Sequence, residues 1–225
     1  MSKLVVCRDT LLLKDKGQLY DNMDTIIEYI SQGNRLLLSS NNPFSHLFFN
    51  TNHIIKVSKR KFVSLPKSTY FTDLSCLNGM FLYTNYGELV NKMQINPKAV
   101  EIFKKIYNNK NDKITYETPF NDEESEIVGG IVINTTPLHW GQTMKDINKV
   151  MEQMIKIDHN LILKSLKKDA SQLRPTTFKI RSIKANEGNQ INEIVNNSDV
   201  NPKEVHYLGE IQPNSLIKCL KMIMR

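Results

Sequence analysis

Two short apolar runs near the start of the chain, at 3–7 and 35–40, flank a segment with helical periodicity. The runs are rich in Leu and Val, as buried strands are. Between them, Met23, Ile26, Ile27 and Ile30 recur every three or four positions, which predicts a helix that stops at Gly33. A strand, a helix and a second strand in this order build a parallel sheet. Ligands bind at the carboxyl ends of such strands, so the polar residues just after each run are the first candidates for a site.

The middle of the chain mixes both kinds of pattern without a repeat. Two helices are predicted, at 97–107 and 143–157, because apolar residues there recur at helical spacing. Residues 58–72 are basic and irregular, 80–89 read as a hairpin, and 160–166 fit a strand or a helix equally well. The predicted strands are 53–57, 74–79, 114–120 and 129–135.

The last fifty residues return to alternating elements. Strands are predicted at 176–183 and 205–210, helices at 189–195 and 215–224, and an Asn-rich loop between the first helix and the second strand. The fold class is therefore α/β, with a Rossmann-like core and parallel sheet made of 1–82 and 177–225. Residues 83–176 form an inserted α+β cap domain.

Composition adds limits to this picture. The chain has 225 residues, of which 40% are hydrophobic and 24% charged, enough for one core with a smaller inserted lobe. No apolar run is long enough to span a bilayer, and the N-terminal segment lacks the long apolar stretch of a secretory signal. Three cysteines, Cys7, Cys76 and Cys219, have neither disulfide nor zinc spacing. We therefore expect a cytoplasmic protein without a membrane partner.

The net charge of +7 leaves nucleic acid as a partner to consider. Short basic clusters occur at 56–61 and 164–168, but no aromatic residues interleave with them to stack on bases. A basic, solvated surface explains this charge better than a nucleic-acid-associated factor does, so nucleic acid is only the third functional hypothesis.

Four segments, in order, carry a resemblance to a known family. They are VVCRDTLLL (5–13), QGNRLLLSSNNP (32–43), LSCLNGMFLYTNYGELV (74–90), and the stretch from FKIRSIKANEGNQINEIV to VHYLGEIQPNSLIKCLK. Together they resemble the haloacid dehalogenase superfamily, in particular its Cof-like and trehalose- or sucrose-phosphate phosphatase branch. The resemblance covers most of the chain outside the cap.

The resemblance implies a phosphatase chemistry. In that family an Asp after the first strand attacks phosphorus and forms an aspartyl-phosphate, and an Asp two residues later acts as general acid and base. A hydroxyl after the second strand and a Lys hold the phosphate, while acidic residues after the last strand hold Mg²⁺ through oxygen ligands.

The residues at the nucleophile and acid positions depart from that pattern. Without a gap, Val6 stands at the nucleophile and Arg8 at the acid, and neither side chain can do that chemistry. With one residue deleted, Cys7 takes the nucleophile position and Asp9 the acid position.

The phosphate- and metal-binding positions are altered as well. Ser40 matches the hydroxyl, but Glu187 replaces the Lys, and Lys184 is the nearest substitute. Glu210 and Asn214 stand at the two metal-binding positions.

The hypothesis that follows is a catalytically degenerate, phosphatase-like protein that binds or regulates. Its partner is a phosphorylated small molecule or a protein, and it needs no cofactor. The residues that would bind the ligand are Arg8, Thr10, Ser40, Asn41, Asn78 and Lys184. The alternative is a sugar-phosphate phosphatase that uses Cys7 or Asp9, with Mg²⁺ on Glu210.

Some of these residues also have purely structural interpretations. Arg8 and Asp9 suit a surface ion pair as well as an anion site, Ser40 suits a helix N-cap before Pro43, and Asn78 suits a tight turn before Gly79.

Overall fold

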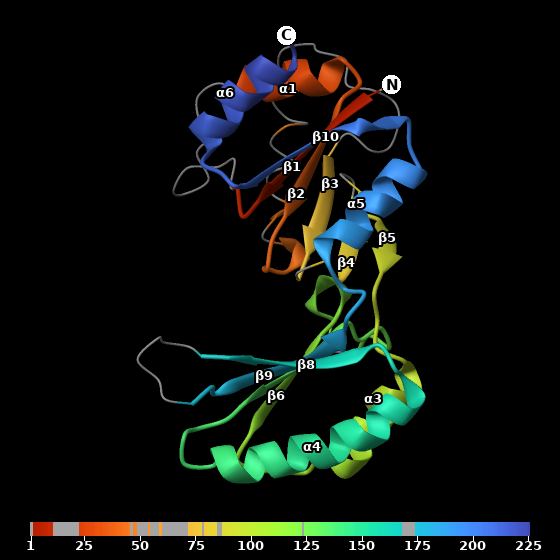
Figure 1. Ribbon diagram of the computed structural model, residues 1–225, viewed down its shortest axis with the longest axis vertical. Coiled ribbons are helices and arrows are strands. Elements are labelled where there is room, and N and C mark those ends of the chain that lie inside the picture. The colour runs from red at the N-terminus through yellow and green to blue at the C-terminus, as the bar shows by residue number, and fades with distance from the viewer. Residues whose placement is uncertain are drawn as a thin grey trace. The chain divides into compact units, whose positions relative to one another are not determined.

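The computed structural model describes residues 2–10, 23–45, 47–48, 54, 59, 72–77, 79–84, 87–122, 124–167 and 174–225. The chain divides into two compact units. Met1–Asn91 and Asn186–Arg225 form the first unit, and Lys92–Ala185 form the second. Each unit has its own sheet and its own helices (Figure 1).

The first unit is built on a six-stranded sheet in the order β10-β1-β2-β3-β4-β5. β10, β1, β2 and β3 run parallel, and β4 is antiparallel to β3. The predicted α/β class with a mainly parallel sheet is confirmed. The strands are β1 (Ser2–Arg8), β2 (Arg35–Ser39), β3 (Thr72–Cys76), β4 (Phe81–Tyr83), β5 (Leu89–Lys92) and β10 (Val200–Glu210).

Helices on both faces explain why the central strands are continuous apolar runs. The four residues from Leu4 to Cys7 in β1 are fully buried. Leu4, Val6 and Leu37 pack in one cluster with Ile194 of α5 (Glu187–Asn196). On the other side of the sheet, α1 (Met23–Ser31) and α6 (Pro213–Ile223) lie next to each other (Figure 1). α1 ends as predicted, at a Gly33 with φ of 84° whose N–H donates to the Ile30 carbonyl.

The second unit is an antiparallel sheet backed by two helices (Figure 1). Its strand order is β6-β7-β9-β8, and a short 3₁₀ helix, η2 (Pro119–Asn121), follows β6. Apolar residues from α3 and α4, such as Phe103 and Met154, pack with Ile131, Ile133 and Ile180 of the sheet. The elements are α3 (Pro97–Ile106), β6 (Lys113–Glu117), β7 (Gly130–Asn134), α4 (Trp140–Ile157), β8 (Leu161–Leu166) and β9 (Thr177–Ser182).

The boundaries between the units lie later than the sequence pattern suggested. The second unit runs from 92 to 185, whereas 83–176 was predicted for the insert. Residues 177–182, which the sequence pattern had assigned to the first unit, form β9, and β9 pairs with β7 on one side and with β8 on the other. Residues 83–91 belong to the first unit, where β4 and β5 end its sheet.

A few elements also differ from prediction. The ambiguous segment at 160–166 is a strand, β8, and α4 starts three residues earlier than expected, at Trp140. β10 begins at Val200, inside the predicted loop. The predicted strand at 53–57 lies outside the described residues except Ile54, which is buried and helical. None of the helices in the described ranges is long and apolar enough to cross a bilayer.

Candidate functional site

The carboxyl edge of the first sheet brings together the residues predicted to form the site. Arg8 at the end of β1 is level with Ser39 of β2 and with Glu210 of β10. Asp9 and Ser40 follow these two strand ends. The backbone N–H of Asp9 donates to the Ser39 carbonyl at 2.7 Å, which holds the residue at the sheet edge.

Asp9 and Ser40 bind each other. The Ser40 hydroxyl donates to Oδ1 of Asp9 at 2.5 Å, and it accepts from the backbone N–H and the side-chain amide of Asn42, each at 3.1 Å. Ser40 is only 1% exposed, so one donor and two acceptor positions account for the whole hydroxyl. Asp9 has φ of 49°, a left-handed conformation that Asp tolerates better than most residues. The hydroxyl expected to hold a phosphate therefore holds a carboxylate of the same chain.

The guanidinium of Arg8 lies close to both Asn41 and Asp9. Its Nη2 donates to Oδ1 of Asn41 at 3.0 Å, and its Nε lies 3.7 Å from Oδ2 of Asp9. Both members of the ion pair are about one-third exposed, so the pair contributes only about 0.2–1 kcal/mol to stability. A guanidinium at this place is nevertheless a suitable ligand for an anion, since it offers several N–H donors.

Thr10, a predicted ligand-binding residue, has its hydroxyl close to two backbone carbonyls. Its hydroxyl lies 2.8 Å from the Ile211 carbonyl and 3.2 Å from the Arg8 carbonyl, and the residue is 2% exposed. It therefore joins the segment after β1 to the segment after β10, and its hydroxyl is bound to the backbone.

Cys7 is placed poorly for the nucleophilic role it was given in one alignment. The residue is fully buried, and its Sγ lies 3.8 Å from the Leu37 carbonyl. Burial raises the pKa of the thiol to about 12. A thiol with such a pKa is protonated at neutral pH, and the thiolate is the reactive form. These surroundings correspond to a small hydrophobic residue of the core.

A tyrosine that the sequence analysis did not single out lies in the same region. Tyr207 of β10 donates to Oε2 of Glu187 at 2.7 Å, and this bond is the main cause of its raised pKa. The charges of Arg8 and Glu210 also act on Tyr207, so these groups share one neighbourhood. Glu187 is in the first turn of α5, where the family resemblance implied a phosphate-binding Lys. The alternating pattern of VHYLGE was the only sequence signal for Tyr207.

The two predicted metal ligands are both exposed side chains. Glu210 is exposed at the end of β10, and Asn214 is exposed in the first turn of α6. Oδ1 of Asp9 already accepts from Ser40, and the cation of Arg8 lies beside Oδ2. A neighbouring positive charge opposes the binding of a divalent cation. Across the described ranges, no group of three or more His, Cys, Asp or Glu side chains is placed to hold a metal ion.

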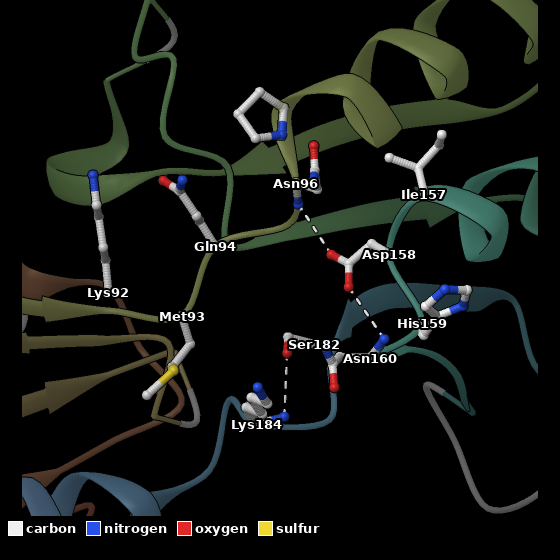
Figure 2. Close-up of a pocket in the computed structure, with 11 residues that line it drawn as sticks. Lys92, Met93, Gln94, Asn96, Ile157, Asp158, His159, Asn160, Ser182 and Lys184 are labelled. Atoms are coloured by element: carbon white, nitrogen blue, oxygen red, sulfur yellow. Dashed lines mark hydrogen bonds between the residues drawn. The ribbon is translucent and has the colours of Figure 1, made fainter.

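Of the two remaining predicted ligand residues, one lies outside the described residues and the other belongs to the second unit. Asn78 lies outside the described residues. Lys184 belongs to the second unit and lines a pocket there of about 440 Å³ (Figure 2). Lys92 and His159 contribute further polar groups to the same pocket.

Asp158 organises this pocket. Its Oδ2 accepts from the backbone N–H of Asn96 at 3.0 Å, and its Oδ1 accepts from the backbone N–H of Asn160 at 3.1 Å (Figure 2). Because both oxygens are bound, Asp158 ties the end of α4 to the start of α3. The carboxylate of Asp158 therefore has a structural role in the second unit.

Comparison with known proteins gives matches by structure. No family model matches the sequence, and no curated protein is significantly similar to it. The phosphatase BT1666 of the haloalkanoate (HAD) superfamily, from Bacteroides thetaiotaomicron, superposes with a TM-score of 0.60 at 12% identity, covering 100% of this chain and 96% of that one. The chain has the haloacid dehalogenase fold. A haloacid dehalogenase-like hydrolase from Bacteroides thetaiotaomicron matches with a TM-score of 0.58 at 12% identity, covering 100% and 99%. TM0651 from Thermotoga maritima matches with a TM-score of 0.54 at 14% identity, covering 92% and 79%.

The residue that directly follows β1 is Asp9. Val6, which the ungapped alignment put at the nucleophile position, lies within β1 and is buried in the cluster that packs against α5.

Proposed function

We propose that this protein is a catalytically degenerate, phosphatase-like protein that acts as a binding or regulatory subunit for a phosphorylated small molecule or a protein partner. The observation that carries the proposal is the hydrogen bond from Ser40 to Asp9, with Arg8 beside it. A phosphate could reach the Ser40 hydroxyl only by displacing the Asp9 carboxylate, because Asn42 takes the other positions of that hydroxyl.

The charges around the edge support the same proposal. Phosphoryl transfer through an aspartyl-phosphate needs a free carboxylate and positive charge on the transferred oxygens. Here the carboxylate of Asp9 is engaged, and Glu187 supplies a negative charge at the position where the family has a Lys. Both features disfavour the reaction, whereas Arg8 and Asn41 still offer polar contacts to a bound anion or partner.

One observation favours a second candidate, a sugar-phosphate phosphatase with an atypical nucleophile. Asp9 directly follows β1, and its side chain is 32% exposed, so it is within reach of solvent. If Asp9 turned away from Ser40, its carboxylate could attack phosphorus and the Ser40 hydroxyl could bind a phosphate oxygen.

A phosphate-release assay separates the two candidates. The protein is incubated at high concentration with p-nitrophenyl phosphate and a panel of sugar phosphates, with and without Mg²⁺. We expect no release above that of the Asp9→Asn variant, with circular dichroism confirming that both proteins are folded. Glu152→Gln is the matched control, because it removes an exposed carboxylate from α4 of the second unit. Turnover that Asp9→Asn abolishes and Glu152→Gln retains would establish the phosphatase and reject the degenerate protein.

A further inference from the structure

The second sheet ends in two edge strands, β6 and β8. β6 pairs with β7 on one side, and no strand of the described ranges pairs with it on the other. A hollow of about 460 Å³ is lined by four consecutive β6 residues, from Lys113 to Tyr116. Their side chains alternate between the two faces, and no described residue of β7 lines the hollow, so it lies along the free edge. Such an edge presents backbone groups that can pair with a further strand.

The backbone groups of Ile114 and Tyr116 point toward this free edge. The carbonyl of Glu117 accepts from the backbone N–H of Gly129 at 2.8 Å, so it is directed toward the β7 side. Successive residues of a strand direct their N–H and C=O groups to opposite edges. The groups of Ile114 and Tyr116, which alternate with Thr115 and Glu117, are therefore the ones that a new strand would meet.

The side chains of β6 form a pattern that suits pairing with itself. Ile114 and Tyr116 pack against the core with α3 and α4, and both are only partly buried. Lys113, Thr115 and Glu117 alternate with them and lie on the opposite face. Lys113 and Thr115 are exposed. The strand KITYE thus has an apolar residue on each side of its central Thr115 and opposite charges at its two ends.

We propose that β6 is a dimer interface, at which a second copy of this chain adds its own β6 antiparallel to the first, with Thr115 on the two-fold axis. In this register Ile114 of each copy faces Tyr116 of the other, and the two residues exchange the backbone hydrogen bonds that point outward. Lys113 of each copy faces Glu117 of the other, which pairs opposite charges. A surface that meets itself in this way gives a closed two-fold dimer.

Apolar contacts supply most of the attraction in this dimer. Cross-strand pairs of an aromatic and a β-branched side chain, such as Tyr116 and Ile114, stabilise antiparallel sheets. The five residues of β6 alone are too few for a stable interface. α3 extends it, because the Tyr116 ring lies 6.4 Å from the Phe103 ring and 5.2 Å from Nζ of Lys104. α3 is thus beside β6, and the α3 helices of the two copies come together under the joined sheets.

Glu117 offers an acceptor to the lysine of the second copy. Its Oε1 lies 2.6 Å from Nζ of Lys179, while its Oε2 is buried with no hydrogen-bond partner among the described residues. None of the ion pairs of the described residues involves Lys113. The charge of Glu117 also acts on Arg181, so cations of the same chain already share this carboxylate. The new ion pair therefore sets the register more than it adds affinity.

β8, the other edge strand, is a poorer surface for a second copy. Its sequence LILKSL carries a single charge, that of Lys164. The charge of Arg181, followed by burial and the charge of Lys179, lowers the pKa of Lys164, so this lysine already lies among like charges. Pairing β8 with itself would bring the Lys164 residues of two copies near each other, and like charges across strands are destabilising.

Sedimentation velocity over a range of protein concentrations tests the interface, in about 0.15 M salt to screen the net charge of +7. We expect the unchanged chain to form a dimer as its concentration rises. Thr115→Glu sets two carboxylates against each other at the two-fold axis and should raise the dissociation constant about tenfold or more. Ser165→Glu is the matched control, because Ser165 is an exposed hydroxyl residue of β8, and it should dimerise as the unchanged chain does. Circular dichroism confirms that both variants are folded.

Disulfide trapping tests the register. Thr115→Cys, in a Cys219→Ser background, places two thiols across the axis. The Cα atoms of a non-hydrogen-bonded antiparallel pair lie about 4.5 Å apart, which a disulfide can bridge. Mild oxidation should join this variant into a covalent dimer, whereas Ser165→Cys in the same background should stay a monomer on a non-reducing gel.

Several outcomes would reject this interface. They are a monomer at every concentration up to about 1 mM, equal dimerisation of the unchanged chain and Thr115→Glu, and equal cross-linking of the two cysteine variants. A dimer that Ser165→Glu dissociates would put the interface at β8 instead. A monomer would leave the β6 edge to a strand of a different protein and would reject the second copy. None of these measurements involves phosphate, so a failure of this interface and a failure of the proposed function are distinguishable.

Discussion

The hydrogen bond between Ser40 and Asp9 is of the strong, charge-assisted kind, because a hydroxyl donates to a carboxylate. Its distance of 2.5 Å is at the short end for such pairs. Ser40 is buried, so removing the carboxylate would leave its hydroxyl proton without this acceptor. Asp9 thus contributes to the structure of the edge whether or not it takes part in chemistry.

Cysteine reactivity tests the environment of Cys7. Cys7 and Cys76 are fully buried, and burial raises the pKa of both thiols, while Cys219 is partly exposed. We expect iodoacetamide at pH 8 to alkylate Cys219 in the folded protein and to reach Cys7 and Cys76 only after unfolding in urea. Peptide mass spectrometry at successive times measures the three rates. If Cys7 were alkylated in the folded protein as fast as Cys219, its thiol would be accessible, and Cys7 would again be a candidate nucleophile.

The sequence could predict which residues reach the sheet edge, but not what they do there. Ser40, Asn41, Arg8 and Asp9 follow from the rule that residues after parallel strands meet at one edge. The bond between Ser40 and Asp9 depends on the strand register and on the left-handed backbone of Asp9, and no pattern of residue types encodes either.

At the level of elements, the turn between β3 and β4 is held against the start of α5. Gly79 has φ of 82°, and a Cβ built on it would lie 2.4 Å from the backbone carbon of Asn186. Asn186 is the N-cap of α5, and its side chain accepts from the backbone N–H of Asn189 at 2.9 Å. Gly79 therefore packs so closely against the N-cap of α5 that no side chain fits at position 79.

Gly79→Ala should destabilise the protein strongly. The left-handed backbone costs a side chain about 1–2 kcal/mol, and the clash with backbone atoms adds about 1–3 kcal/mol. Gly33→Ala is the matched control, since Gly33 has a similar φ of 84° but nothing within 4 Å of its Cβ position. Urea unfolding of both variants measures the difference. Equal losses of stability in the two variants would mean that the turn does not pack closely against Asn186.

Element types were predicted better than element partners. Alternation in TTFKIRSI predicted β9 correctly, because each apolar residue of a half-buried strand faces the core. The same alternation cannot say which sheet the strand joins, and β9 joined the second sheet. β8 was ambiguous for a related reason. Leu161 and Leu163 pack with the core, whereas the three residues from Lys164 to Leu166 are exposed. The alternation typical of a strand therefore covers only the first half of these six residues, which is too short to distinguish a strand from a helix.

At the level of the whole chain, cysteine and tyrosine side chains with raised pKa values make the stability of the fold depend on pH in the alkaline range. The pKa is raised for Cys7, Cys76, Tyr29, Tyr107, Tyr116 and Tyr207, and burial is the main cause for all but Tyr207. The groups lie in both units. Each one ionises in the unfolded chain at a lower pH than in the folded chain, because burial, or for Tyr207 first the hydrogen bond to Glu187, disfavours the charged form.

The sign of the effect follows from proton linkage. Below about pH 9 these groups are protonated in both states, so their contribution to stability is complete. Between pH 9 and 12 the thiol of Cys7 is ionised when unfolded and protonated when folded, so unfolding releases a proton and stability falls as pH rises. Cys7 alone accounts for about 1–1.5 kcal/mol between pH 7 and pH 10, and Cys76 adds a similar amount.

Urea unfolding at pH 7 and pH 10, with a reducing agent present, measures this loss. Cys7→Ala lowers stability at pH 7 by leaving a small cavity, yet its further decrease from pH 7 to pH 10 should be smaller by about 1–1.5 kcal/mol. Cys219→Ala, at the partly exposed thiol, is the matched control and should keep the full decrease of the unchanged protein. A Cys7→Ala variant that loses as much stability as the Cys219→Ala variant over this range would mean that the Cys7 thiol is not shielded from solvent. The buried position of Cys7 at the end of β1 would then be wrong, and with it the reason for excluding Cys7 from the chemistry of the sheet edge.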